Sequence, residues 1–330
     1  MANRNFNRKN ISAMFSVEKY LMLSAIIFLT GCDIPSRGMV YTQDKEDKLQ
    51  FNCTNENVYL PALDPQADNW FKQARVLEKA EGAKNFSMIG LLYRQAIAKD
   101  HYKAMRNLQN LLLEGLVSPV PGKKASEEAL EIVERMMKLN IPAGYYAMGY
   151  YLENGYGVEA DRNASLAYFR KSADLGSPEG QSVIANILLY PKLLSGERNV
   201  AYSPEVGKSM LDCASMQGLA DAAIKLARYY SGVEKKYQLA VKYLQYAVIN
   251  GSELAAYKFT KSFNDPAPTD TLDYLGLQKD SERVHRYELI YNEIDKNPSA
   301  RFPDLDKIVP LPPAPLPKWD GSFEYKKGGK

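Results

Sequence analysis

The chain has 330 residues, enough for one large domain or two small ones, and 45% of them are hydrophobic, as in an ordinary globular protein with a sizeable core. Its formal charge is +3, but residues 1–31 hold four basic residues and one acidic residue, so the remainder is neutral. That remainder has one basic cluster, at its end (Lys326, Lys327 and Lys330), which argues against nucleic-acid binding because phosphate contacts need clustered Lys and Arg.

The N-terminus has the layout of a secretory signal. Lys19 precedes an apolar run from Tyr20 to Leu29, about half the roughly 20 residues that a spanning helix needs. The sequence Leu29-Thr30-Gly31-Cys32 resembles a bacterial lipobox, which implies acylation of the cysteine. We therefore expect a signal peptide over residues 1–31 and a palmitate-type anchor at Cys32. The alternative is a short core helix that ends at a chance Gly-Cys pair.

Two details of this segment concern its start and its destination. Met14 is a second candidate start, because the stretch before Lys19 is long for such a signal. Asp33 follows Cys32, and an Asp there resembles the inner-membrane retention signal of enteric lipoproteins. We expect a periplasmic, lipid-anchored protein, with the inner membrane favoured over the outer membrane.

Residues 32–66 are predicted to be an N-terminal arm, because they show no sustained hydrophobic period. The arm contains Cys53, and the only cysteine after it is Cys213. In an oxidising compartment, such a pair favours a disulfide that ties the arm to a distant part of the chain. The alternative is two unpaired thiols, one of them buried. After the arm, a helix is predicted with Asp68 as its N-cap and with apolar residues at helical spacing: Trp70, Phe71, Ala74 and Leu77.

The centre of the chain repeats itself. Residues 166–176, 208–218 and 241–251 each contain large apolar or aromatic residues, then Ala or Ser, then Gly, which ends a helix in the left-handed conformation without a Cβ penalty. Including two earlier copies, the terminators are Asp100, Asn140, Gly176, Gly218 and Gly251, at steps of 40, 36, 42 and 33 residues. Such a period is typical of helix-turn-helix solenoids.

The second repeat is the most specific. Its stretches from Met148 to Val158 and from Tyr168 to Gly176, with Asp161 between them, resemble a Sel1-like repeat, a relative of the tetratricopeptide repeat. The resemblance implies an all-α fold, an α/α solenoid of helix-turn-helix repeats, which we place at residues 67–296. Its small residue Gly149, which allows close helix packing, is replaced by Ala185 and Ala227 in later repeats, and Gly155 and Gly157 allow the turn. The third repeat departs most, with an inserted loop from Pro191 to Pro204.

The C-terminal flank contains a loop at residues 265–268 and a last predicted helix from Ser281 to Ile294. Residues 297–330 form a proline-rich tail, which favours polyproline II structure. Its alternating Leu and Pro and its Trp319 indicate a tail that lies against the body, the alternative being a disordered tail.

The whole layout resembles a group of bacterial Sel1-repeat lipoproteins with a similar arm and a similar closing stretch, Pro310 to Gly321. Members of that group resemble immunity partners encoded beside type VI secretion phospholipase effectors. The resemblance therefore implies a protein-binding immunity function.

No catalytic motif supports an enzyme. The sequence lacks a GxSxG elbow, HExxH, Walker A and a Rossmann glycine pattern. It also lacks CxxC, and His101 and His285 are its only histidines, so no metal site is expected. We expect no catalysis and no cofactor.

A partner-binding face is predicted from the repeat alignment. Aligning the first helix of each repeat puts Tyr150, Asn186 and Arg228 in one column and Tyr145 with Gln181 in another. Tyr and Arg are over-represented in interface hot spots. The predicted contact residues are Tyr145, Tyr150, Glu153, Asn186 and Arg228. Tyr146, Tyr151 and Tyr229 are interpreted as helix-packing aromatics, because they match apolar positions of the repeat.

Two functions follow as hypotheses. In the first, a lipid-anchored immunity protein binds a type VI secretion lipase or phospholipase effector and blocks it sterically. In the second, the protein is a Sel1-repeat scaffold or adaptor in the cell envelope. An envelope hydrolase has no supporting motif.

Overall fold

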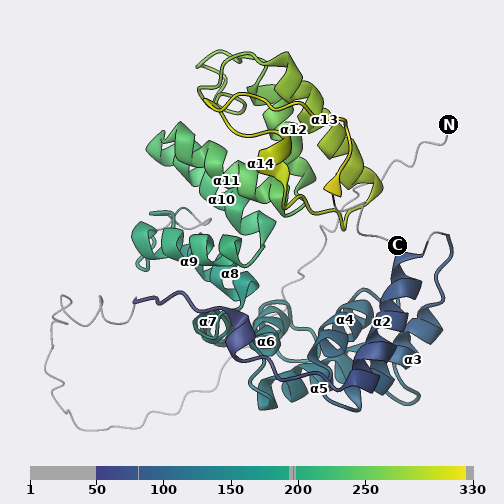
Figure 1. The fold of residues 1–330 in the computed structure, drawn as a ribbon. Helices are drawn as coiled ribbons and strands as arrows, with labels where there is room; N and C mark the ends of the chain where they lie inside the picture. Colours follow the sequence, from purple (N-terminus) through teal and green to yellow (C-terminus); the bar gives the residue numbers. More distant parts are fainter. Residues whose placement is uncertain (1–49, 81, 193–195, 197, 325–330) are drawn as a thin grey trace, which may run out of the picture. The chain divides into compact units, whose positions relative to one another are not determined.

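The computed structural model describes residues 50–80, 82–192, 196 and 198–324, all within the compact unit of residues 45–330. The predicted signal peptide, Met14, Cys32 and Asp33 lie outside the described residues. Within the described ranges the regular structure is helical, apart from an isolated β-bridge between Lys192 and Arg198 (Figure 1). None of the helices described is long and apolar enough to cross a membrane.

The helices follow one another through the described chain, with the longest connections between α8 and α9 and between α12 and α13. They are the 3₁₀ helix η1 (Glu56–Val58), α2 (Pro65–Lys79), α3 (Phe86–Ile97), α4 (Tyr102–Leu113), α5 (Ala125–Lys138), α6 (Pro142–Asn154), α7 (Arg162–Asp174), α8 (Pro178–Leu188), α9 (Pro204–Met216), α10 (Ala220–Tyr229), the π-helix η2 (Tyr230–Glu234), α11 (Tyr237–Ile249), α12 (Glu253–Ser262), α13 (Ser281–Lys296) and α14 (Leu305–Ile308).

Consecutive helices pack against each other from α2 to α13, and two pairs of alternate helices also meet. In particular, α8 contacts both α6 and α10. The first helix of each repeat belongs to one layer and the second helix to another. This arrangement is an α/α solenoid, which confirms the fold class expected from the repeats.

All five predicted helix terminators have a left-handed backbone. Their φ angles are 56° at Asp100, 54° at Asn140, 89° at Gly176, 93° at Gly218 and 78° at Gly251. Each of them is followed within two residues by the start of the next helix. The repeat period read from the sequence is therefore the period of these turns.

Small residues set the distance between paired helices. A Cβ at Gly149 would lie 2.7 Å from the ring of Phe169 on α7, and a Cβ at Gly180 would lie 2.8 Å from the backbone nitrogen of Ala173. Ala185 and Ala227, which take the place of Gly149 in later repeats, are buried. The expected role of this position in close packing is confirmed.

The first α-helix begins earlier than predicted. Asp64 is the N-cap of α2, and its carboxylate accepts the N–H groups of Gln66 and Ala67, each at 2.9 Å. The prediction of Asp68 as the cap is wrong, because Asp64 directly precedes Pro65, whose fixed φ suits the first helical position. Asp68 lies inside the helix and forms an ion pair with Lys72 at 2.6 Å.

The proline-rich tail lies against α13, as expected. Phe302, Leu305 and Val309 are buried in the same core as the last repeats. The guanidinium of Arg283 donates to the carbonyl of Pro310 at 3.1 Å, and that of Arg286 donates to Pro317 at 2.9 Å. The described part of the tail therefore covers the end of the solenoid, where an exposed helix face would otherwise meet water.

Candidate protein-binding face

Three of the predicted contact residues occupy the same place on three neighbouring helices. Tyr150, Asn186 and Arg228 are each the ninth residue of their helix, on α6, α8 and α10. All three side chains are exposed, Tyr150 to 39%. Because α8 contacts both α6 and α10, the three side chains form one row on the layer of first helices.

The other two predicted residues on α6 differ from each other. Glu153 is exposed and follows Tyr150 by three residues, so it points to the same side of the helix. Tyr145 precedes Tyr150 by five residues, about 140° around the axis at 3.6 residues per turn. The Tyr145 hydroxyl donates to Asn140 Oδ1 at 3.3 Å, and its ring lies 6.5 Å from that of Tyr168. The structure therefore does not bring Tyr145 together with the row.

The row continues onto α4, which sequence reasoning did not include. Asn110 is the ninth residue of α4 and is exposed. Asn110, Tyr150, Arg106 and Glu179 line a recess of about 90 Å³. An ion pair between Arg106 on α4 and Glu179 on α8 spans this recess. Extending the repeat backwards from the terminator at Asp100 would have found these positions.

The tyrosines interpreted as packing residues do pack. Tyr151 is 1% exposed, its hydroxyl donates to Gln109 Oε1 at 2.7 Å, and burial raises its pKa. Tyr229 is buried, and the ring of Tyr146 lies 5.6 Å from that of Phe169. These residues hold the solenoid together and leave Tyr150 as the exposed aromatic of the row.

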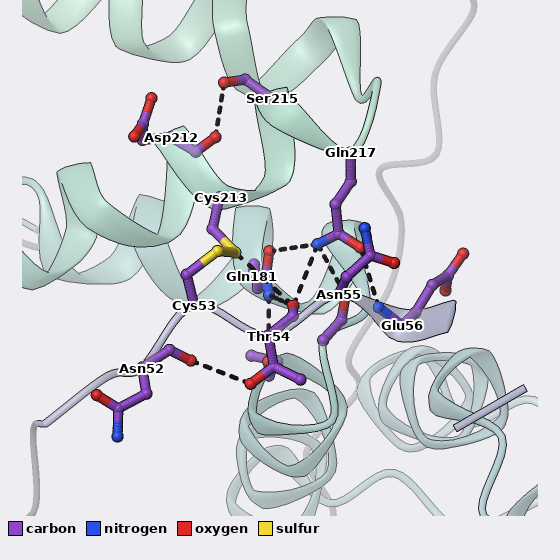
Figure 2. Close-up of a disulfide and its surroundings, with 12 residues drawn as sticks. Asn52, Cys53, Thr54, Asn55, Glu56, Gln181, Asp212, Cys213, Ser215 and Gln217 are labelled. Carbon is purple, nitrogen blue, oxygen red and sulfur yellow. Dashed lines mark hydrogen bonds between the residues drawn. A yellow bond between two sulfur atoms is a disulfide. The ribbon is translucent and has the colours of Figure 1, made fainter. Parts of the chain in front are cut away.

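A disulfide joins Cys53 of the arm to Cys213 on α9, which is the pairing expected from the compartment (Figure 2). Two glutamines beside it hold the arm backbone. Gln181 Nε2 on α8 donates to the Thr54 carbonyl at 3.1 Å, and Gln217 Oε1 accepts the N–H of Glu56 at 3.0 Å. Gln181 is fully buried by these contacts, so its predicted column with Tyr145 is not a contact surface.

The described part of the arm runs from the third repeat back to the first. Cys53 is fixed at α9 by the disulfide, and Thr54 lies so close to Gly176 that a Cβ on Gly176 would be 2.6 Å from the Thr54 carbonyl oxygen. Its end is fixed by Asp64, whose carboxylate pairs with Lys99 at 3.0 Å. The arm is thus a structural part of the surface beside the row.

One histidine has a structural role and the other lies on the surface. His101 is buried as the N-cap of α4, and its Nδ1 accepts the N–H of Ala104 at 3.1 Å, whereas His285 is exposed. In the part of the chain that the structure describes, no three or more His, Cys, Asp or Glu side chains are grouped to hold a metal ion.

Comparison with known proteins identifies the class of this solenoid. Residues 142–177 and 220–252 match the Sel1 repeat family, and residues 255–330 match the family described as domain of unknown function DUF6396. No curated protein matches the chain. The repeats are therefore Sel1 repeats, as their sequence indicates.

Solved structures then identify the family. Immunity protein Pa5087 from Pseudomonas aeruginosa is 33% identical with a TM-score of 0.65, over 81% of this chain and 96% of that one. Immunity protein PA5088 from the same species is 30% identical with a TM-score of 0.65, over 80% and 95%. P. aeruginosa PA5086 is 31% identical with a TM-score of 0.63, over 80% and 96%. This chain belongs to the family of these proteins, and the family and its repeats point to a protein partner.

Proposed function

We propose that this protein is an immunity protein that binds a toxic effector and blocks it by covering the effector's catalytic face. The effector that we propose is a lipase or phospholipase delivered by type VI secretion. The observation that carries the proposal is the identity of 30–33% with immunity proteins over about four fifths of the chain.

The inhibition that we propose is steric. The row of Tyr150, Asn186 and Arg228 offers an aromatic ring and a guanidinium on neighbouring helices, and both are side-chain types over-represented in interface hot spots. The surface would exclude the phospholipid substrate from the effector without any chemistry of its own. Non-catalytic action agrees with relatives that are named for immunity.

The proposed site of action is the periplasm, at a lipid anchor on Cys32. Two or three acyl chains give a stable attachment, whereas one is marginal. An anchored inhibitor would be concentrated at the phospholipid surface on which the effector acts. The inner membrane is the one we propose, because Asp33 follows the acylated cysteine.

The function is tested first by the genes beside this one, among which we expect a type VI secretion lipase effector. A soluble form of the protein that spans residues 50–330 is mixed with that effector at saturating concentration, and phospholipid hydrolysis is measured. We expect loss of hydrolysis in proportion to complex formed. An effector that binds yet stays fully active would contradict direct blockade and favour the scaffold function.

The anchor is tested in cells with the Cys32→Ala variant. Wild-type protein is expected to incorporate labelled palmitate and to sediment with membranes, and the variant to do neither. Ser36→Ala serves as the control, because it changes a residue near Cys32 and leaves both the lipobox and the disulfide intact. Equal palmitate labelling of the wild type and Cys32→Ala would show that Cys32 is not the acylation site.

A further inference from the structure

A second cavity lies between the arm and the helices α2, α4 and α6 of the solenoid. Its volume is about 530 Å³, within the range of sites that enclose ligands or side chains. The arm supplies one wall, through Glu56, Asn57 and Leu60. Arg106 and Ala143 line both this cavity and the recess beside Tyr150, so the cavity adjoins the proposed binding row.

The lining combines an apolar floor with charged side chains of both signs. Leu60, Phe71 and Ile141 supply apolar surface. Three cations, which are Arg75, Lys103 and Arg106, line the cavity with a single carboxylate, that of Glu56. Such a lining favours an acidic side chain with an apolar neighbour where one of the cations is not already paired with a carboxylate of this chain.

One of the three cations has no carboxylate of its own. Arg75 pairs with Glu78, and Arg106 pairs with Glu179. Lys103 is exposed beside the ring of Tyr102, at 5.8 Å from its centroid, and no carboxylate of the described residues lies within ion-pair distance of it. Lys103 is therefore the group that can gain most from a carboxylate brought by a partner.

The carboxylate in the cavity, that of Glu56, lies in surroundings that disfavour its negative charge. Burial raises the pKa of Glu56, and the negative charge of Glu179 raises it further. A second carboxylate from a partner would be repelled by Glu56 and attracted by Lys103 and Arg106. Removing the positive charge of Lys103 and removing the negative charge of Glu56 are therefore expected to change the binding affinity in opposite directions.

We propose that this cavity receives an acidic loop of the effector, with a carboxylate at Lys103 and Arg106 and an apolar side chain on Phe71 and Leu60. The occupant is part of the effector, so this inference rests on the proposed function. In this proposal the arm, held in place by its disulfide, forms one wall of the binding site and does not block the entry of the effector loop.

The test compares single substitutions by calorimetry, with a catalytically inactive form of the effector found by the test of the proposed function as the probe. Lys103→Glu is expected to weaken binding about tenfold or more, and Glu56→Gln to tighten it about threefold, because charge pairs act in opposite directions here. Lys103→Met gives an intermediate loss. The matched control is Lys171→Glu, an exposed lysine on α7 outside both cavities, which leaves affinity unchanged.

The outcomes separate this inference from the function beneath it. If the wild type binds the effector but Lys103→Glu binds equally well, the cavity is not the site and the immunity function stands. If the wild type binds no effector, both fail. Overlapping short peptides of the effector give a second measurement: the peptide that competes best should be acidic, and a basic one would overturn the proposal.

Discussion

At the residue scale, the absence of a Cβ at Gly149 allows the two helices of the second repeat to pack closely. Gly149 on α6 faces Phe169 on α7, and a Cβ would lie 2.7–3.0 Å from three ring carbons of that phenylalanine. Phe169 is 2% exposed, so its ring has no free space into which to move. A methyl group here must push the two helices apart.

Gly149→Ala is therefore expected to lower the free energy of unfolding by about 1–3 kcal/mol, although alanine is the better helix former. Urea denaturation followed by circular dichroism measures the change. Gly232→Ala is the control, because a Cβ at Gly232 would meet nothing within 4 Å. Equal stability of the two variants would show that the contact with Phe169 does not limit the packing.

His101 makes the fold sensitive to acid. The ring is buried against Phe71, with centroids 4.7 Å apart, and burial lowers its pKa from 6.5, although Asp68 opposes this. Since Nδ1 accepts the N–H of Ala104, the folded protein holds the neutral ring. The unfolded chain then binds a proton more readily, so stability falls as the pH drops below 6.5 toward the lower folded pKa.

We expect His101→Asn to remove this part of the pH dependence, because asparagine keeps the N-cap but does not titrate. Unfolding free energies are measured by denaturant titration at neutral and at mildly acidic pH. His285→Asn, at the exposed histidine, should retain the wild-type slope. The assignment fails if His101→Asn loses stability in acid as steeply as the wild type.

At the scale of elements, the sequence predicted those features that depend on interactions between residues close together in the chain. The five terminators ended helices as expected, because a left-handed residue needs no distant partner. The path of the arm was not predictable, since it depends on Gln181 and Gln217, more than 100 residues away from Thr54 and Glu56. For the same reason the sequence placed Gln181 on a contact column, although the arm buries it.

The disulfide makes the arm a fixed element. It closes a loop across a sequence separation of 160 residues, which in the chain-entropy model stabilises the fold by up to about 5 kcal/mol. Replacing both Cys53 and Cys213 with serine should lower stability and release the arm around residue 53 from α9. Limited chymotrypsin digestion should then cut at Tyr59, with the helical circular dichroism signal retained. Identical digestion of the variant and the oxidised wild type would show that hydrogen bonds alone hold the arm.

At the scale of the whole molecule, the arm and the tail add contacts that a plain solenoid lacks. Repeats normally touch only their neighbours, so each can open separately. Here the arm links Lys99 before α4 to Cys213 on α9, and the tail is held by Gln245 on α11, whose amide donates to the Val309 carbonyl at 3.0 Å. These long-range ties favour one rigid surface, which lowers the entropic cost of binding a large partner.

A rigid surface should concentrate binding energy in few residues. Tyr150→Ala combined with Arg228→Glu is expected to weaken effector binding at least tenfold, because both residues are exposed hot-spot types in one row. Tyr246→Ala combined with Lys242→Glu makes the same chemical change on α11, where Tyr246 is 37% exposed, and should leave affinity unchanged. Calorimetry on both double variants decides: unchanged affinity of the first would place the interface elsewhere on the solenoid.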